Sequence, residues 1–145
     1  MKNLLKGLVI SGPTGVGKTD ISLIIAKEIH SDIISADSMQ IYKEMDIGTA
    51  KITNEEMNGI KHYMLSIVNP DEDYSVGEFE KEGNRILKEK EKNKENIMLV
   101  GGTGLYIKAL TDGFSDLPSK NKNLRKSLEE KSIEELSEEL KSLDM

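Results

Sequence analysis

The sequence GPTGVGKT, residues 12–19, is the feature that most constrains the fold of this chain. It matches the phosphate-loop pattern G-x-x-x-x-G-K-[ST] without a mismatch, and it lies between an apolar stretch, GLVISG, and a run with helical periodicity. Such a loop turns a strand into a helix, so that backbone N–H groups, the helix N-terminus and a lysine face one anion. The motif predicts a phosphate or diphosphate site but does not by itself identify ATP.

Every residue of this loop is a candidate phosphate contact. Glycines let the backbone N–H groups turn toward one centre, Lys18 supplies a full positive charge, and Thr19 can place its hydroxyl on a bound Mg²⁺. The predicted phosphate-binding residues are Gly12, Pro13, Thr14, Gly15, Val16, Gly17, Lys18 and Thr19, with Thr19 also the predicted metal ligand.

Short apolar runs alternate with helical patterns along the next hundred residues. The predicted strands are residues 7–12, 32–37, part of 59–68, and the apolar start of 96–104. The predicted helical faces are Ile21, Ile24, Ile25 and Ile29 in one helix, and Phe79, Ile86, Leu87 and Lys90 in another. Strands alternating with helices predict an α/β fold: a phosphate-loop NTPase-like parallel sheet flanked by helices.

The C-terminal part has a different pattern. A polar linker, residues 115–123, precedes a capping-box pair, Ser132 and Glu135. The helix that follows carries an apolar stripe, which consists of Ile133, Leu136, Leu140 and Leu143. This stripe either packs back on the domain or belongs to a longer protein. We predict an incomplete phosphate-loop core over residues 1–118. For residues 119–145, the family resemblance given below implies the truncated start of a helical insertion domain.

Composition excludes several classes of protein. The chain has 145 residues, about one domain, and no cysteine, so disulfides and thiolate metal sites are excluded. No apolar run approaches a membrane span or a signal peptide, so a cytoplasmic protein is expected. The net charge of −6 argues mildly against a nucleic-acid partner, but residues 1–51 contain six acids and six lysines and are neutral.

Asp37 ends the second predicted strand, where it should face the phosphate loop, because ligands bind at the carboxyl ends of parallel strands. Three roles stay open for it: a helix N-cap, a ligand of Mg²⁺-bound water, or a catalytic group. Ser38 and Gln40 are expected to form ordinary loop hydrogen bonds. Tyr42 and Met45 are expected to be core residues.

Three further features carry weaker signals. The sequence GGTG, residues 101–104, predicts a second turn at the same sheet edge, where glycines would permit close approach to a ligand. His62 is expected to be a hydrogen-bonded core histidine, and His30 a helix C-terminal capping residue. Neither histidine has the partners that a metal cage requires.

Several segments together resemble the tRNA dimethylallyltransferase family, the isopentenyl transferases that act on tRNA. They are GPTGVGKT, DSMQIYKEMDIGTAK, HYMLSIVNPDEDYSVGEF and GGTGLYIKAL, followed by DLPS and by Arg125 in NLRKSLEE. The resemblance runs over nearly all of the chain. Its second and fourth segments are specific, whereas the phosphate loop alone would not be.

The resemblance implies transfer of a dimethylallyl group from its diphosphate to N6 of the adenine next to the anticodon of tRNA. Asp37 would be the base that takes the N6 proton, and Thr103 would form a hydrogen bond where N6 meets the allyl group. The implied tRNA contacts are Asp37, Ser38, Met39, Gln40, Thr103 and Arg125. Mg²⁺ would assist the leaving diphosphate, and the complete protein is expected to be a monomer.

Two alternatives stay open. Members of the family are roughly twice this length and carry an Arg-rich segment that grips tRNA, so this chain could be an inactive phosphate-binding fragment. The other alternative is a small-molecule or nucleotide kinase. A kinase needs a lid with arginines, and only Arg85 and Arg125 are present, which disfavours that function.

Overall fold

The computed structural model of the chain describes residues 7–113 and 121–143, which fall in two compact units, residues 1–114 and 115–145. The first unit contains β1 (Leu8–Ser11), α1 (Lys18–Glu28), β2 (Ser31–Ala36), β3 (His62–Tyr63), α2 (Val76–Asn93), β4 (Asn96–Gly101) and α3 (Gly104–Thr111). The second contains α4 (Lys122–Glu129) and α5 (Ile133–Leu143). The predicted domain boundary at residues 118 and 119 lies outside the described residues, and the interpretation of the second unit stays a prediction.

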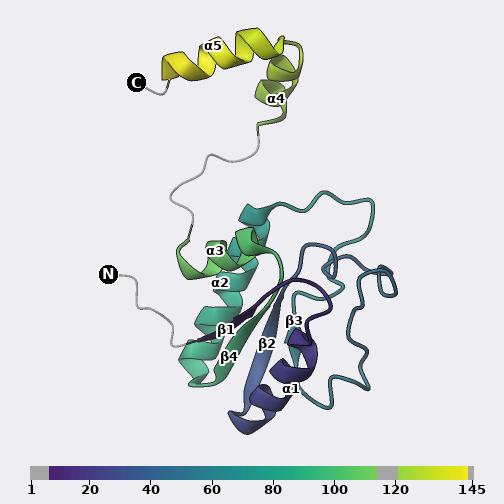
Figure 1. Cartoon of the computed structure of the whole chain (residues 1–145). Helices are drawn as coiled ribbons and strands as arrows, with labels where there is room; N and C mark the ends of the chain where they lie inside the picture. The colour runs from purple at the N-terminus through teal and green to yellow at the C-terminus, as the bar shows by residue number, and fades with distance from the viewer. Residues whose placement is uncertain (1–6, 114–120, 144–145) are drawn as a thin grey trace. The chain divides into compact units, whose positions relative to one another are not determined.

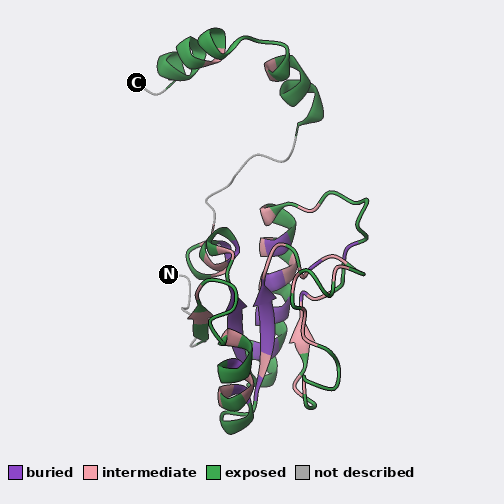
Figure 2. Ribbon diagram, turned by 45° about the vertical axis from the view of Figure 1, so that its right-hand side comes forward, coloured by how far each residue is buried: buried purple, intermediate pink, exposed green. Residues whose placement is uncertain are grey.

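The first unit is a four-stranded parallel sheet in the order β1-β4-β2-β3. Helix α1 lies on one face, and α2 and α3 lie on the other (Figure 1). Strands β2 and β4 are buried between these layers (Figure 2), as expected for a parallel sheet covered on both faces. The predicted α/β fold is confirmed, although only two residues of the 59–68 candidate form a strand.

The predicted face of α2 is the buried one. Phe79, Ile86, Leu87 and Lys90 are all buried. The lysine is accommodated because its ammonium pairs with Asp32 at 2.5 Å and also with Glu95.

Gly83 interrupts the predicted face of α2 for a packing reason. A Cβ added at this position would lie 2.6 Å from Cδ2 of Leu110, so the glycine lets α2 and α3 approach closely.

The predicted isoleucine face of α1 is not the face that packs on the sheet. The helix forms as predicted, but Ile21, Ile24 and Ile29 are exposed, and only Ile25 packs partly against the core. The buried positions are Ser22 and Ala26. Small residues bring a helix closer to a sheet than branched ones, so the four isoleucines did not identify the contact face.

The C-terminal edge of the sheet brings three distant segments together. Ser11 of β1 and Ala36 of β2 both pair with Gly101 of β4, so these strands end at the same level. The phosphate loop, the turn after Ala36 and the turn after Gly101 therefore start side by side.

The second unit consists of two helices without a buried residue among those described (Figure 2). The predicted capping box is present: Ser132 N–H donates to Glu135 Oε2 at 2.8 Å, and Glu135 N–H donates to Ser132 Oγ at 3.2 Å. Ile133, Leu140 and Leu143 of the apolar stripe are exposed, and Leu136 is half-buried. Much of the predicted linker lies outside the described residues.

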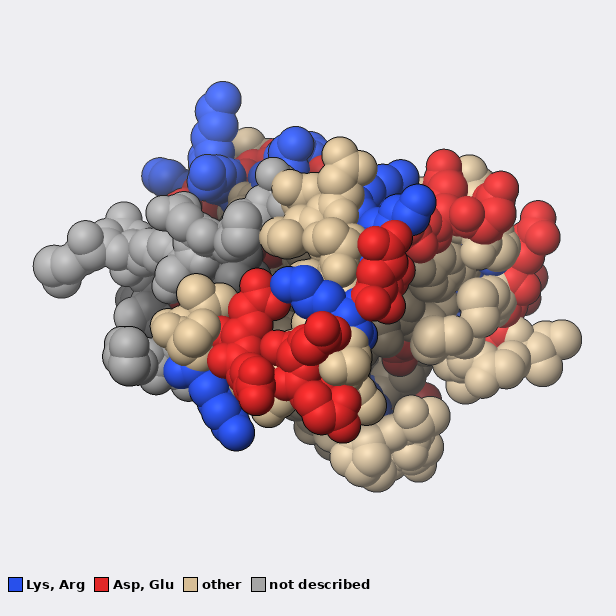
Figure 3. All heavy atoms as spheres, turned by 90° about the horizontal axis from the view of Figure 1, so that it is seen from above, with Lys and Arg blue, Asp and Glu red and all other residues tan. Residues whose placement is uncertain are grey.

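Charges of both signs share the surface. On the face drawn in Figure 3, both red Asp and Glu side chains and blue Lys and Arg side chains are present. None of the helices in the described parts of the chain is both long enough and apolar enough to cross a membrane.

Candidate active site

The phosphate loop has the geometry that its sequence predicts. Gly15 and Gly17 have φ values of 83° and 84°, a left-handed conformation that favours glycine. Gly17 is the N-cap of α1, so the positive end of the helix lies at the loop. The ammonium of Lys18 donates to the carbonyl of Pro13 at 2.6 Å, which holds its charge over the loop.

Asp37 closes the turn that follows β2. Its Oδ1 accepts from the N–H groups of Met39 at 2.9 Å and Gln40 at 3.2 Å, which is the capping-type contact that the sequence left open. Within the described ranges, no residue donates to the other carboxylate oxygen, Oδ2. One oxygen is therefore fixed by the backbone, and the second can accept a proton.

The turn after β4 is connected to the Asp37 turn. Ser38 N–H donates to Thr103 Oγ1 at 3.0 Å, and the Thr103 hydroxyl donates to Ser38 Oγ at 3.3 Å. The N–H of Thr103 donates to the carbonyl of Ala36 at 3.0 Å. Thr103 thus positions the segment that carries Asp37.

Two glycines of GGTG, Gly101 and Gly102, pack against neighbouring backbones, and the predicted close approach to a ligand stays a prediction. A Cβ on Gly101 would lie 2.2 Å from the carbonyl oxygen of Ala36, and one on Gly102 would lie 3.2 Å from that of Gly12. This packing of neighbouring backbones brings the phosphate loop against the two turns.

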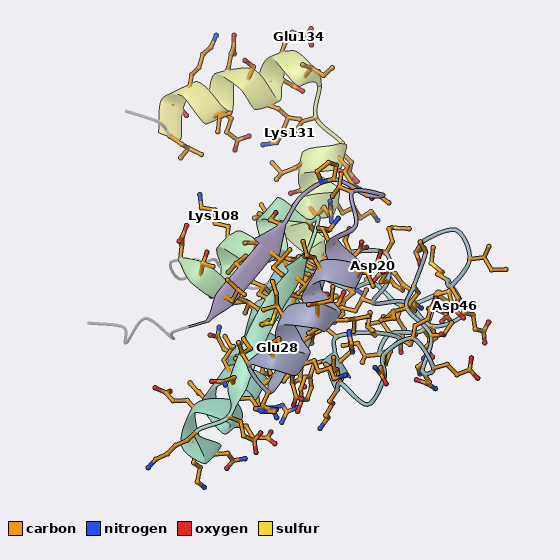
Figure 4. All side chains as sticks on the ribbon, turned by 60° about the horizontal axis from the view of Figure 1, so that its bottom comes forward. Asp20, Glu28, Asp46, Lys108, Lys131 and Glu134 are labelled. Atoms are coloured by element: carbon orange, nitrogen blue, oxygen red, sulfur yellow. The ribbon has the colours of Figure 1, made fainter. Side chains whose placement is uncertain are left out.

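Two cavities meet at Asp37. One, of about 310 Å³, is lined by the phosphate loop with Lys18 and Thr19, by Ser22 of α1 and by the sheet residues Ile33 and Ser35. The other, of about 830 Å³, lies on the side of Ser38, Met39 and Thr103. Asp37, Thr14 and Thr49 line both. Figure 4 labels one residue from the lining of each cavity. Asp20, which lines the smaller cavity, lies on α1, and Asp46, which lines the larger cavity, lies on the loop between β2 and β3.

Thr49 is a site residue to which sequence reasoning assigned no role. Its carbonyl accepts from the Gln40 side-chain amide at 3.0 Å, and its hydroxyl donates to the carbonyl of Met45 at 2.6 Å. The sequence did contain a signal for this residue, because Gly48 and Thr49 fall within DSMQIYKEMDIGTAK, one of the segments that carry the family resemblance. Met45, predicted to be core, is half-buried and lines the larger cavity, whereas Tyr42 packs against the core as predicted.

His62 is half-buried and also lines the smaller cavity. Burial lowers the pKa of His62, and the hydrogen bond between its Nδ1 and the carbonyl of Ile60, at 2.9 Å, opposes that change. A carbonyl can only accept, so Nδ1 carries the proton of the neutral ring. The expected hydrogen-bonded histidine is confirmed, with its Nε2 atom left as an acceptor.

The smaller cavity contains oxygen donors of the kind that Mg²⁺ prefers. Thr19, Asp20 and Asp37 line it, although no cluster of three or more His, Cys, Asp or Glu with metal-binding geometry occurs among the described residues. Mg²⁺ is typically held by one or two carboxylates, water and substrate phosphates, so these residues fit it without a full protein cage.

Arg125 lies on α4 in the second unit. Its Nε atom is 3.5 Å from Glu129 Oε1, and both side chains are exposed. Both residues of this pair belong to α4, and the contact does not test binding of tRNA. The predicted tRNA contact of Arg125 therefore stays a prediction.

Comparison with known proteins gives consistent results. The family model described as IPP transferase matches residues 40–145. The chain is 52% identical over 128 residues to a tRNA dimethylallyltransferase of Fusobacterium nucleatum, covering 88% of this chain and 42% of that protein.

Two solved structures are similar to the chain. The tRNA isopentenylpyrophosphate transferase of Bacillus halodurans has a TM-score of 0.76 and 39% identity, over 97% of this chain and 48% of that one. A eukaryotic dimethylallyltransferase acting on tRNA has a TM-score of 0.75 and 30% identity, over 87% of this chain and 32% of that one.

The chain therefore spans less than half the length of the relatives named above. The family model, however, matches most of its residues, and the relatives extend the match to the phosphate loop. The chain belongs to the IPP transferase family.

Proposed function

We propose that this chain carries the diphosphate site and the general base of a tRNA dimethylallyltransferase, the name that its relatives bear. The observation that carries the proposal is the position of Asp37 at the junction of two cavities. The smaller one is lined by most of the phosphate loop, and the larger one by Ser38, Met39 and Thr103, three of the residues that the resemblance assigns to tRNA. A diphosphate and a nucleobase could thus reach the same carboxylate from two sides.

The smaller cavity would bind the diphosphate. The loop N–H groups, the N-terminus of α1 and the ammonium of Lys18 would stabilise the negative charge that gathers on the leaving group. Thr19, with a carboxylate nearby, would hold Mg²⁺, which supplies further charge stabilisation when bound.

Asp37 would accept the proton from N6 of the target adenine. The exocyclic amine is a poor nucleophile, because its lone pair is delocalised into the ring. As the N6–carbon bond forms and the allylic carbon–oxygen bond breaks, the N6 proton moves to the carboxylate and the diphosphate leaves with the bonding electrons. Because Oδ1 is held by the N–H groups of Met39 and Gln40, Oδ2 is the oxygen that would take the proton.

The adenine would have to leave its stack to reach Asp37. Ser38, Met39 and Thr103 line the larger cavity and would contact the extruded nucleotide, whereas Gln40 lines the smaller one. Arg125 would contact tRNA from the second unit. This assignment for Arg125 rests on the resemblance alone.

A second candidate function is diphosphate binding without transfer by the 145-residue chain itself. The observation that favours it is the share of the relatives' length, 42% to 48%, that the chain spans in the two bacterial comparisons. A fusion chain tests the two candidates against each other. It joins residues 1–143 to the part of the Fusobacterium nucleatum relative that this chain does not match.

The experiment mixes each chain with radiolabelled dimethylallyl diphosphate and unmodified tRNA. Label in tRNA from the 145-residue chain supports transfer by the chain itself. Label from the fusion chain alone supports the binding-only function for residues 1–145. No label from either chain contradicts the proposed function, and ATP-dependent phosphorylation of a small acceptor would support a kinase instead.

A further inference from the structure

The loop that forms the outer wall of the larger cavity, residues 43–51, is held in place by a buried lysine. The side chain of Lys51 is only 6% exposed. Its ammonium contacts the carbonyl of Tyr42 at 2.6 Å, the hydroxyl of Ser66 at 2.9 Å and Asp46 Oδ1 at 2.7 Å. One cation thus ties the loop to the segments on both of its sides.

The tip of this loop is closed by its own backbone. Lys51 N–H donates to the carbonyl of Asp46 at 3.0 Å, and Ala50 N–H donates to that of Ile47 at 3.2 Å. Together with the Gln40 and Thr49 contacts described above, these bonds fix the backbone on both sides of Ile47. The loop is therefore a formed turn that presents its tip residue in one place.

That tip presents an apolar side chain to water at the cavity wall. Ile47 is 98% exposed and Met39 is 47% exposed, and both line the larger cavity together with Asp37. Single exposed hydrophobic residues are common and by themselves indicate nothing. Here the exposed residue lies on a turn held by an ion pair between the buried Lys51 and the exposed Asp46, and it lines the same cavity as Asp37.

The charges at this wall decide which part of a nucleic acid could bind. Glu44 and Asp46 line the same cavity, and the charge of Asp46 is balanced by Lys51. The charge of Glu44 is not balanced in this way, and a carboxylate of this kind repels a phosphate group. The cavity wall therefore disfavours the RNA backbone. An uncharged base face meets no such penalty, and bases extruded from a stack are commonly buried against apolar or aromatic side chains.

We propose that Ile47 and Met39 form an apolar platform for a loop nucleotide adjacent to the target adenine. Extruding the adenine exposes the face of its neighbour, and the platform would cover that face while the adenine enters the cavity toward Asp37. Met39 can adapt to either a purine or a pyrimidine because its thioether chain is flexible. This inference rests on the proposed function, since it requires an RNA substrate.

The test measures binding of the 145-residue chain to short RNA hairpins with an adenine in the loop, by fluorescence anisotropy. Ile47→Ala should weaken binding roughly tenfold, because a large part of the isoleucine contact is removed. Ile47→Phe should restore the affinity, since a ring covers a base face at least as well. The matched control is Ile24→Ala on α1, which removes an exposed isoleucine that lines neither cavity and should change nothing.

Hairpins with an abasic site on either side of the target adenine show whether the contact is with a base. For one of them, Ile47→Ala should cause no further loss, because the base that it contacts is already missing. Equal losses with intact and both abasic hairpins would mean that Ile47 acts through the fold, and this would overturn the platform. No loss with intact RNA would overturn it as well and leave a protein-docking role for the exposed isoleucine.

The failure of this inference is distinguishable from that of the proposed function. If the wild-type chain binds no hairpin and the fusion chain transfers no label, both fail. If the fusion chain transfers label and Ile47→Ala binds as wild type does, only the platform fails. A wild-type chain that binds no hairpin while the fusion chain transfers label also overturns the platform, because the platform lies within residues 1–145.

Discussion

Thr103 and Ser38 are 65 residues apart in the sequence and are joined by two hydrogen bonds. Thr103 Oγ1 accepts from the Ser38 N–H and also donates to the Ser38 hydroxyl. The turn after β4 therefore fixes the turn after β2, and Asp37 immediately precedes the fixed residue. The position of the candidate base depends on this connection between two strands.

Thr103→Val should remove both hydrogen bonds while keeping the size of the side chain. It leaves the Ser38 N–H without its partner, which typically costs about 1–3 kcal/mol of stability. We expect a lower free energy of unfolding in urea and slower label transfer by the fusion chain, with diphosphate affinity within a few-fold of wild type. Thr103→Ser keeps the hydroxyl and is the control. A valine variant with wild-type transfer would show that Thr103 does not position the base.

Lys18→Ala should weaken diphosphate binding by roughly one to two orders of magnitude, because charge-assisted hydrogen bonds contribute about 1.5–3 kcal/mol. Titration calorimetry of the 145-residue chain measures the dissociation constant. Lys27→Ala is the matched control, since Lys27 lies in the last turn of the same helix and lines neither cavity. An unchanged dissociation constant for Lys18→Ala would remove the phosphate loop as the anion site.

Gly83→Ala should leave the first unit less stable than the matched variant Gly77→Ala does, because the new methyl group would lie 2.6 Å from Leu110 Cδ2 and the leucine must move. Gly77→Ala, in the same helix, is the control. The nearest atom to its added Cβ is 3.9 Å away, and alanine favours a helix over glycine. Urea denaturation of both variants measures the difference. Equal stabilities would show that α2 and α3 can separate without cost.

The apolar stripe of α5 should bind a hydrophobic dye or cause self-association, because Ile133, Leu140 and Leu143 are exposed together on one helix. Leu140→Glu should reduce dye fluorescence, whereas Ser142→Glu, which adds the same charge at an exposed position of the helix, should not. Dye fluorescence and sedimentation measure the two effects. A chain that is strictly monomeric and binds no dye would contradict the prediction.

The sequence predicted the features that local patterns encode. The phosphate loop, the alternation of strands and helices and the buried face from Phe79 to Lys90 all follow from spacing. The contact face of α1 could not be predicted in this way, because Ser22 and Ala26 pack through their small size rather than their hydrophobicity. The role of Gly83 likewise became clear only with Leu110 of α3 in place.

The conformation of the loop between β2 and β3 could not be predicted from local sequence patterns, for a different reason. Glu44, Ala50 and Asn58 have positive φ values although none is glycine. Such conformations are imposed by tertiary contacts like those of Lys51, which the sequence does not reveal. The cavity wall that this loop forms, including Thr49 and Ile47, was therefore missed at the level of single residues.

Single-turnover transfer by the Asp37→Asn variant of the fusion chain tests the central claim most directly. Asparagine can still accept from the N–H groups of Met39 and Gln40, so the turn should persist, but a neutral amide cannot take the N6 proton. We predict that transfer to tRNA falls by about 10²–10⁴-fold, the usual contribution of a general base, while diphosphate binding stays within a few-fold of wild type. Transfer within about three-fold of wild type would contradict the assignment of Asp37 as the base.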